Sequence, residues 1–157
     1  MEKKNIRLTP QQAIPKIEYF CNYSERCQQE VAEKLYSYGL NTDEVNELLL
    51  HVVKAGLVNE ERFAILFAGG KFRQKDWGRN KIKRELKQRQ ISDFNIKKAM
   101  AEIDDEAYMK TLEKLAEKYI RTLKDKLPFM KQQKATKYLV SKGFEYDLIS
   151  DVLKKLK

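Results

Sequence analysis

An apolar pattern occurs three times along this chain. In each copy two apolar residues stand four positions apart, a turn residue follows after another four, and an apolar residue comes next. The turn and the apolar residue after it are Gly39-Leu40, Gln90-Ile91 and Gly143-Phe144, which gives a period of 51 and then 53 residues. Such a period is the signature of a repeat protein. One unit of this size has little core of its own, so we expect the units to pack end to end.

The spacing of apolar residues elsewhere is helical. Between Val45 and Val53, apolar residues recur at i, i+3, i+4, i+7 and i+8, and no segment alternates with a period of two. We therefore predict an all-α fold of three tandem three-helix repeats, helix-turn-helix-like, packed into an elongated, curved array. The predicted units are residues 1–57, 58–103 and 104–157.

Capping residues predict where several helices begin. Polar residues suited to an N-cap precede the expected helices at Thr9, Ser24, Asn41, Asn59 and Ser92. In the helix after Asn59, we expect Phe63, Leu66 and Phe67 to face inward, and Gly69-Gly70 to kink the helix or end it early. In the helix after Ser92, Phe94 is expected on the inner face.

The second turn of the repeat departs from the other two, because Gln90 stands where they have glycine. Either Gln90 adopts the strained left-handed conformation, or the turn differs there.

Composition excludes several classes of function. His51 is the only histidine and Cys21 and Cys27 are the only cysteines, so no zinc site and no Ser-His-Asp or Cys-His arrangement is apparent. We expect buried or half-buried free thiols, no metal, no cofactor and no enzymatic activity. With no run of about 18 apolar residues and no secretory signal pattern, we expect no membrane association and a cytoplasmic location.

The positive charge is concentrated between Lys71 and Ile91. Nine basic residues there face two acidic ones, a balance of +7 out of +9 for the whole chain. With Ile82 and Leu86 facing inward, Arg79, Lys83 and Lys87 form a stripe of like charge, which destabilises an isolated helix. The stripe is either a solvated helix face or a site for an anionic partner. Trp77, the only tryptophan, either stacks on that partner or packs the turn into the core.

The motif Phe63-x3-Phe67, then Trp77-Gly78-x3-Ile82-x3-Leu86-x4-Ile91, resembles the middle unit of the RecX family of regulators of the RecA recombinase. That family also has tandem three-helix units of about this length, and the resemblance extends from about Thr9 to Leu156.

The resemblance implies a regulatory protein that binds the RecA filament on single-stranded DNA and mainly inhibits its recombinase, ATPase and co-protease activities in DNA repair and the SOS response. The resemblance also implies that the middle unit contacts the filament or its DNA. The residues to which we assign this contact are Lys71, Arg73, Lys75, Trp77, Arg79, Lys81, Lys83, Arg84 and Lys87. We expect the protein to be a monomer. Two alternatives stay open: a helix-turn-helix DNA-binding transcriptional regulator, and a helical adaptor that binds no nucleic acid.

Overall fold

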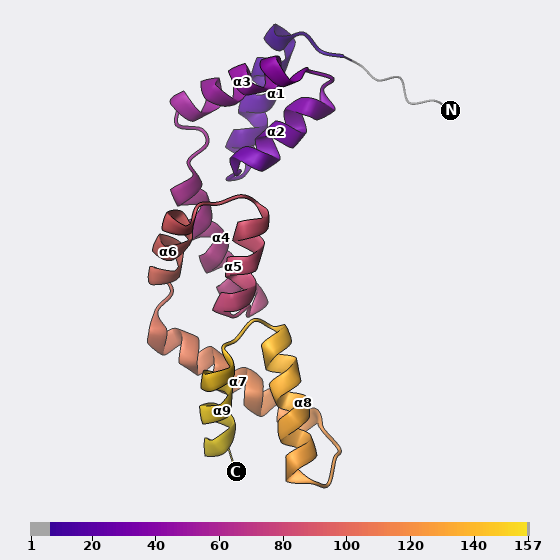
Figure 1. The fold of residues 1–157 in the computed structure, drawn as a ribbon, viewed down its shortest axis with the longest axis vertical. Coiled ribbons are helices and arrows are strands. Elements are labelled where there is room, and N and C mark those ends of the chain that lie inside the picture. Colours follow the sequence, from indigo (N-terminus) through magenta and orange to yellow (C-terminus); the bar gives the residue numbers. More distant parts are fainter. Residues whose placement is uncertain (1–6, 157) are drawn as a thin grey trace, which may run out of the picture.

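The computed structural model describes residues 7–156, which form helices and connecting turns without a strand. The helices stack in three successive triplets along one elongated, gently bowed column, with the first triplet and the C-terminal residues at opposite ends (Figure 1). This confirms the predicted all-α repeat fold. The bounds are α1 Pro10–Tyr23, α2 Gln28–Ser37, α3 Thr42–Lys54, α4 Glu60–Lys75, α5 Arg79–Gln88, α6 Asp93–Ala101, α7 Asp105–Thr122, α8 Pro128–Ser141 and α9 Tyr146–Lys155.

Helix packing is concentrated within the triplets, where each helix contacts the other two. We call α1–α3 the first unit, α4–α6 the middle unit and α7–α9 the third unit. The residue limits predicted for the units stay a prediction. Among the described residues, no helix has the length and apolar character needed to cross a bilayer.

Most helix starts follow the predicted caps. Asn41 accepts from the amide of Glu44, whose carboxylate accepts from the Asn41 amide in return, and Asn59 and Ser92 each accept from an amide three residues on. The prediction for Ser24 was wrong, since it follows the end of α1 and Cys27 caps α2. At this N-cap the backbone amide of Cys27 donates to the Glu30 carboxylate at 3.3 Å. A cysteine is not a typical N-cap, so the sequence carried a misleading signal here.

Two expectations about inner faces were also wrong. Leu66 is 50% exposed and Phe94 is 66% exposed. In α4 the buried positions are Phe63, Ala64, Ala68 and Phe72, and the helix continues through Gly69 and Gly70. Ala64 and Ala68 lie between the two phenylalanines on the buried face, and their small side chains let α4 approach its neighbours closely.

The buried side chains form two cores. One lies within the first unit and includes Ile17, Leu35 and Val52. The other is continuous through the middle and third units and also includes Cys27. Within it Tyr108 packs between Phe72 and Phe144, with ring centroids 5.8 and 5.1 Å apart. The third unit is thus joined to the middle unit by shared aromatic packing.

The turn at Gln90 keeps the geometry of the two glycine turns. Gln90 has φ +60°, beside +84° at Gly39 and +99° at Gly143. The Ile91 amide donates to the Leu86 carbonyl at 3.1 Å, as the Phe144 amide does to Leu139. The strained alternative is therefore the one adopted. Burial of Ile91, which is 4% exposed, explains why the chain holds a glutamine in this conformation.

Candidate interaction surface

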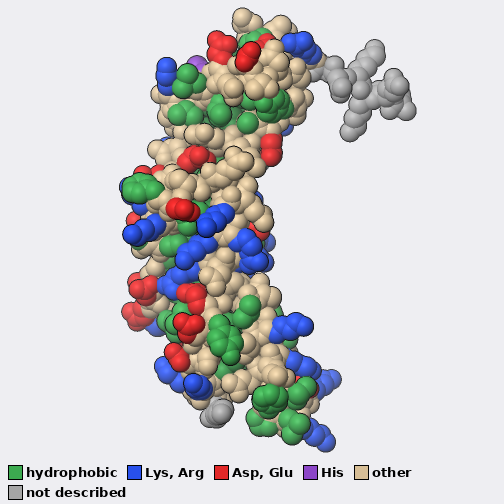
Figure 2. Space-filling model, viewed as in Figure 1, with side chains coloured by type: hydrophobic (Ala, Val, Ile, Leu, Met, Phe, Trp, Pro, Cys, Tyr) green, Lys and Arg blue, Asp and Glu red, His purple; other side chains and the backbone are tan. Residues whose placement is uncertain are grey.

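The basic stretch forms the end of α4, a tight turn and all of α5. Asp76 ends α4 in the left-handed conformation, with φ +55°, and sends the chain through Trp77 and Gly78 into α5. Ile82 and Leu86 are fully buried on the inner side of α5, as predicted. Figure 2 shows Lys and Arg side chains gathered over the middle of the column on the face drawn there.

Trp77 is half-buried between two lysines. Its ring meets Phe67 edge-on at 6.3 Å between centroids. The ammonium groups of Lys71 and Lys81 lie 5.1 and 4.5 Å from the ring centroid. Trp77 therefore packs the turn against the core and also holds two cations beside it. Arg89, which had not been assigned to the site, belongs to the same cluster, with its guanidinium 4.7 Å from the Phe67 ring.

Along α5, Lys83, Arg84 and Lys87 are exposed. Lys87 reaches Asp93 only at 3.9 Å, and Lys83 and Arg84 make no ion pair with any residue from 7 to 156. Lys142 of the third unit lies next to this stretch, since its ammonium donates to the Lys75 carbonyl at 2.7 Å. We call Lys71, Lys75, Lys81, Lys83, Arg84 and Lys87 the basic surface.

Arg79 lies elsewhere, which corrects its expected place in an exposed stripe. Its guanidinium pairs with Glu145 at 2.9 Å and Asp105 at 2.6 Å, and stacks 3.8 Å from the centre of the Tyr108 ring. The Tyr108 hydroxyl accepts from the Arg79 amide at 3.0 Å and donates to Glu145. Burial, together with that bond to Glu145, raises the pKa of Tyr108 above its ordinary value. Arg79 is thus a joint residue between the middle and third units.

Arg73 is separated from the basic surface as well. It lines a groove of about 370 Å³ together with Asp76 and with Lys114 and Lys118 of α7. Lys71 and Arg73 are two residues apart on one helix, so their side chains point in different directions.

Gly78 of the Trp-Gly motif is a contact point between units. Its amide donates to the Lys142 carbonyl at 2.8 Å, and the Asn80 amide donates to the Gly143 carbonyl at 2.9 Å. A Cβ at Gly78 would lie 2.3 Å from the carbonyl carbon of Gly143. The motif therefore serves the joint and positions the basic surface next to it.

Both cysteines are buried free thiols, as predicted. Cys27 is fully buried and its thiol lies 3.2 Å from a Glu30 carboxylate oxygen. Burial is the main reason why its pKa rises to about 12. A thiol held neutral in this way is poorly nucleophilic. No group of His, Cys, Asp and Glu suited to a metal ion occurs in the part of the chain that the structure describes.

Family models match most of the middle and third units. The family model for the second three-helix domain of RecX matches residues 59–100, and that for the third matches residues 105–153, together more than half of the chain. The crystal structure of RecX from Lactobacillus salivarius superposes with a TM-score of 0.83 at 24% identity, covering 94% of this chain and 96% of that one. This likeness concerns the fold.

Curated relatives agree with the family models. The regulatory protein RecX of Streptococcus uberis is 32% identical over 135 residues, which is 85% of this chain and 51% of the relative. That of Clostridium perfringens is 29% identical over 83% of this chain and 62% of the relative. The chain thus spans about half to three fifths of the length of these relatives. From the matched domains and these relatives, we conclude that the chain belongs to the RecX family of regulatory proteins.

Proposed function

We propose that this protein binds the RecA filament on single-stranded DNA and restrains its ATPase, recombinase and co-protease activities. The proposal is supported by membership of the RecX family, which the motif around Trp77-Gly78 had indicated from the sequence. An elongated column of helical units is also a suitable shape for lying along a filament groove across several subunits.

The observation that carries the proposal is the basic surface. Lys83 and Arg84 are exposed and have no ion-pair partner among residues 7–156, while Lys71 and Lys81 flank an aromatic ring. Exposed cations without an ion-pair partner, next to lysines that flank a half-buried aromatic ring, suit a polyanion or an acidic protein groove. Arg73 is included in the proposed contact on the side that faces α7. The role of Arg79 in it is to hold the third unit in place.

A RecA ATPase assay on single-stranded DNA tests the proposal directly. Purified protein is titrated from about one molecule per fifty RecA subunits up to equimolar, and ATP hydrolysis is followed over time. We expect inhibition well below equimolar protein, because a molecule that caps or bridges a filament acts on many subunits. Unchanged hydrolysis at equimolar protein would exclude this function for the chain.

The same preparation separates the two alternatives. Footprinting on duplex DNA would show a preferred site for a transcriptional regulator, whereas a filament regulator protects none. A helical adaptor that binds no nucleic acid would show no salt-dependent affinity for polyanions.

A further inference from the structure

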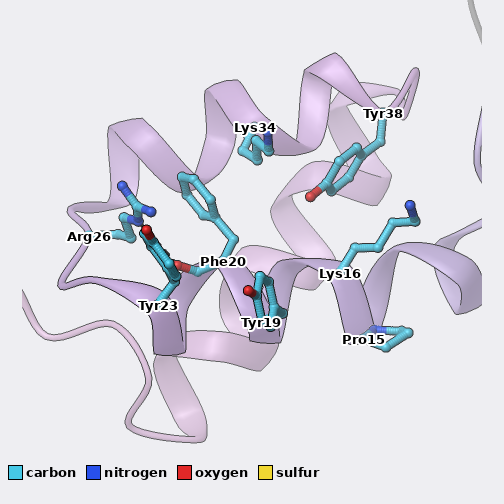
Figure 3. A pocket seen from close by; sticks show the side chains of 8 residues that line it. All are labelled: Pro15, Lys16, Tyr19, Phe20, Tyr23, Arg26, Lys34 and Tyr38. Carbon is cyan, nitrogen blue, oxygen red and sulfur yellow. Dashed lines mark hydrogen bonds between the residues drawn. The ribbon is translucent and has the colours of Figure 1, made fainter.

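A groove of about 540 Å³ lies between α1 and α2 of the first unit, in a different unit from the basic surface. Figure 3 shows its lining: side chains of α1 stand on one side, Lys34 and Tyr38 on the other, and Phe20 lies between them. The groove is therefore bordered only by aromatic and basic side chains and Pro15. No part of the proposed function uses this groove so far.

Two tyrosines of the groove are turned to solvent. Tyr19 is 71% exposed and Tyr23 is 75% exposed, although both carry large apolar rings. They stand one helical turn apart on α1, with ring centroids separated by 6.2 Å and planes inclined by 37°. Rings so exposed contribute little to the core of the first unit, and their faces are available to stack on another ring.

Two of the groove's cations lie over its other aromatic rings, those of Phe20 and Tyr38. The Arg26 guanidinium lies 3.8 Å from the centre of the Phe20 ring, and its Nε donates to the Phe20 carbonyl at 3.1 Å. The Lys34 ammonium lies 5.5 Å from Phe20 and 5.9 Å from Tyr38. Lys16 completes the set on α1 (Figure 3).

The neighbouring carboxylates are engaged elsewhere. Glu25 pairs with Arg62 at 2.6 Å through Oε1, with its Oε2 buried and unpartnered, Glu18 pairs with His51 at 3.1 Å, and Glu30 caps α2. Within residues 7–156, none of the three groove cations makes an ion pair. The side chains that line the groove therefore include three cations and no carboxylate.

We propose that this groove binds single-stranded DNA, with bases stacked on Tyr19 and Tyr23 and phosphates held by Lys16, Arg26 and Lys34. A single strand is the polyanion that carries an aromatic ring in every repeating unit, so it fits both features at once. An acidic peptide would satisfy the cations and leave the exposed rings unused. The inference deepens the proposed function and rests on it for the presence of single-stranded DNA.

The test compares two ligands and two matched variants of the full chain. The ligands are a labelled oligothymidylate and an abasic deoxyribose-phosphate strand of equal length. Tyr19→Ala/Tyr23→Ala removes the groove rings, and Phe94→Ala/Tyr146→Ala removes two rings that are each 66% exposed and lie outside the groove. With the wild type we expect tighter binding of oligothymidylate than of the abasic strand. We expect the groove variant to lose at least about tenfold in affinity for oligothymidylate, and to lose this preference.

Two further variants assign the parts of the groove. Tyr19→Phe/Tyr23→Phe keeps the rings and should bind like the wild type, because stacking does not need the hydroxyls. Lys16→Gln/Lys34→Gln should flatten the slope of log affinity against log salt by about 1.4, because each phosphate that is no longer neutralised removes about 0.7 from the slope.

Each contrary result overturns the inference. Equal binding of the two strands by the wild type, or unchanged affinity in the groove variant, shows that no base stacks here. Polyglutamate serves as a further ligand for this purpose: if Lys16→Gln/Lys34→Gln loses polyglutamate binding but keeps strand binding, the occupant is an acidic peptide. These outcomes can be distinguished from a failure of the proposed RecA regulation. A protein that binds strands through the groove yet leaves RecA hydrolysis unchanged keeps this inference, and one that inhibits RecA without any strand affinity loses it.

Discussion

The backbones of Gly78 and Gly143, 65 residues apart in the sequence, lie directly against each other. A Cβ on Gly143 would come within 2.4 Å of the Lys81 Cβ and 2.6 Å of the Lys81 nitrogen, and Gly143 also has φ +99°. Neither glycine can therefore gain a side chain without separating the middle and third units.

Gly143→Ala is expected to destabilise the protein by about 3 kcal/mol, from backbone strain and the clash with α5 together. Urea unfolding monitored by circular dichroism measures the change. Gly70→Ala is the matched control, since nothing lies within 4 Å of a Cβ there and the residue is inside α4. The control should be more stable by up to about 1 kcal/mol. Equal stability of the two variants would refute the tight contact.

Arg79→Met should cost about 2 kcal/mol, because its hydrogen bonds to the Glu145 and Asp105 carboxylates disappear and Glu145 stays half-buried. Lys83→Met, one turn further along α5 and exposed, should change stability by less than about 0.5 kcal/mol. Denaturation midpoints of the two variants, measured side by side, provide the check. A loss at Lys83 that matches the loss at Arg79 would contradict the joint role.

Gln90→Gly should stabilise the protein by about 0.5–1 kcal/mol. Relief of the left-handed strain, about 1–2 kcal/mol, exceeds the extra entropy that glycine loses on folding, about 0.5–1 kcal/mol. Gln88→Gly, at the last position of α5, should instead destabilise by up to about 1 kcal/mol. Opposite shifts of the thermal midpoint are expected, and a destabilised Gln90→Gly would show that the turn carries no strain.

Lys83→Glu/Arg84→Glu/Lys87→Glu should leave helix content unchanged, because all three side chains are exposed on α5. If all three contact phosphate, the salt slope of single-strand binding should flatten by about 2. RecA inhibition should fall in parallel. Lys54→Glu/Lys154→Glu/Lys155→Glu, which changes the same charge at exposed positions of α3 and α9, serves as the control. A folded triple variant that inhibits like the parent would identify this face of α5 as merely solvated.

Cys27 should make the protein sensitive to alkali. Burial raises the pKa of its thiol from 9.0 to about 12 in the folded state, so folding favours the protonated form. Its contribution to stability is complete below pH 9 and is lost as the pH rises from about 9 toward about 12. Urea unfolding at pH 8 and pH 10.5 should show a smaller pH-dependent loss for Cys27→Ala than for the wild type. Parallel losses would indicate that Cys27 does not titrate with unfolding.

Much of the fold follows from local signals. The period marked by Leu40, Ile91 and Phe144 predicts three units, and all three residues are buried. The prediction that Ser24 caps α2 was wrong because serine is a common N-cap whatever follows it. The actual N-cap is Cys27, whose backbone amide is bound by the Glu30 side chain. The prediction that Phe94 faces inward was wrong because the buried face of α6 consists of Ile96 and Ala99. Aromatic residues are buried only on average, so a single one does not identify the inner face.

The site was harder to predict than the fold. Charge counting found the basic stretch but could not separate Arg79 from Lys83, since Asp105 and Glu145 come from another unit. The groove of the first unit did have a signal, namely Tyr19 and Tyr23 four residues apart outside the apolar face of α1. That pattern becomes informative only once α2 is known to bring Lys34 beside it.

The continuity of the core through α4–α9 bears on cooperativity. Because Tyr108 packs between Phe72 and Phe144, the middle and third units cannot open independently without exposing both rings. The first unit has its own core and joins the rest through Cys27, the Glu25–Arg62 pair and the hydrogen bond from the Gln28 amide to Glu60. Three repeats therefore amount to two cooperative blocks. Slowly exchanging amides should persist longest in α4–α9, while α1–α3 exchange through a separate opening event.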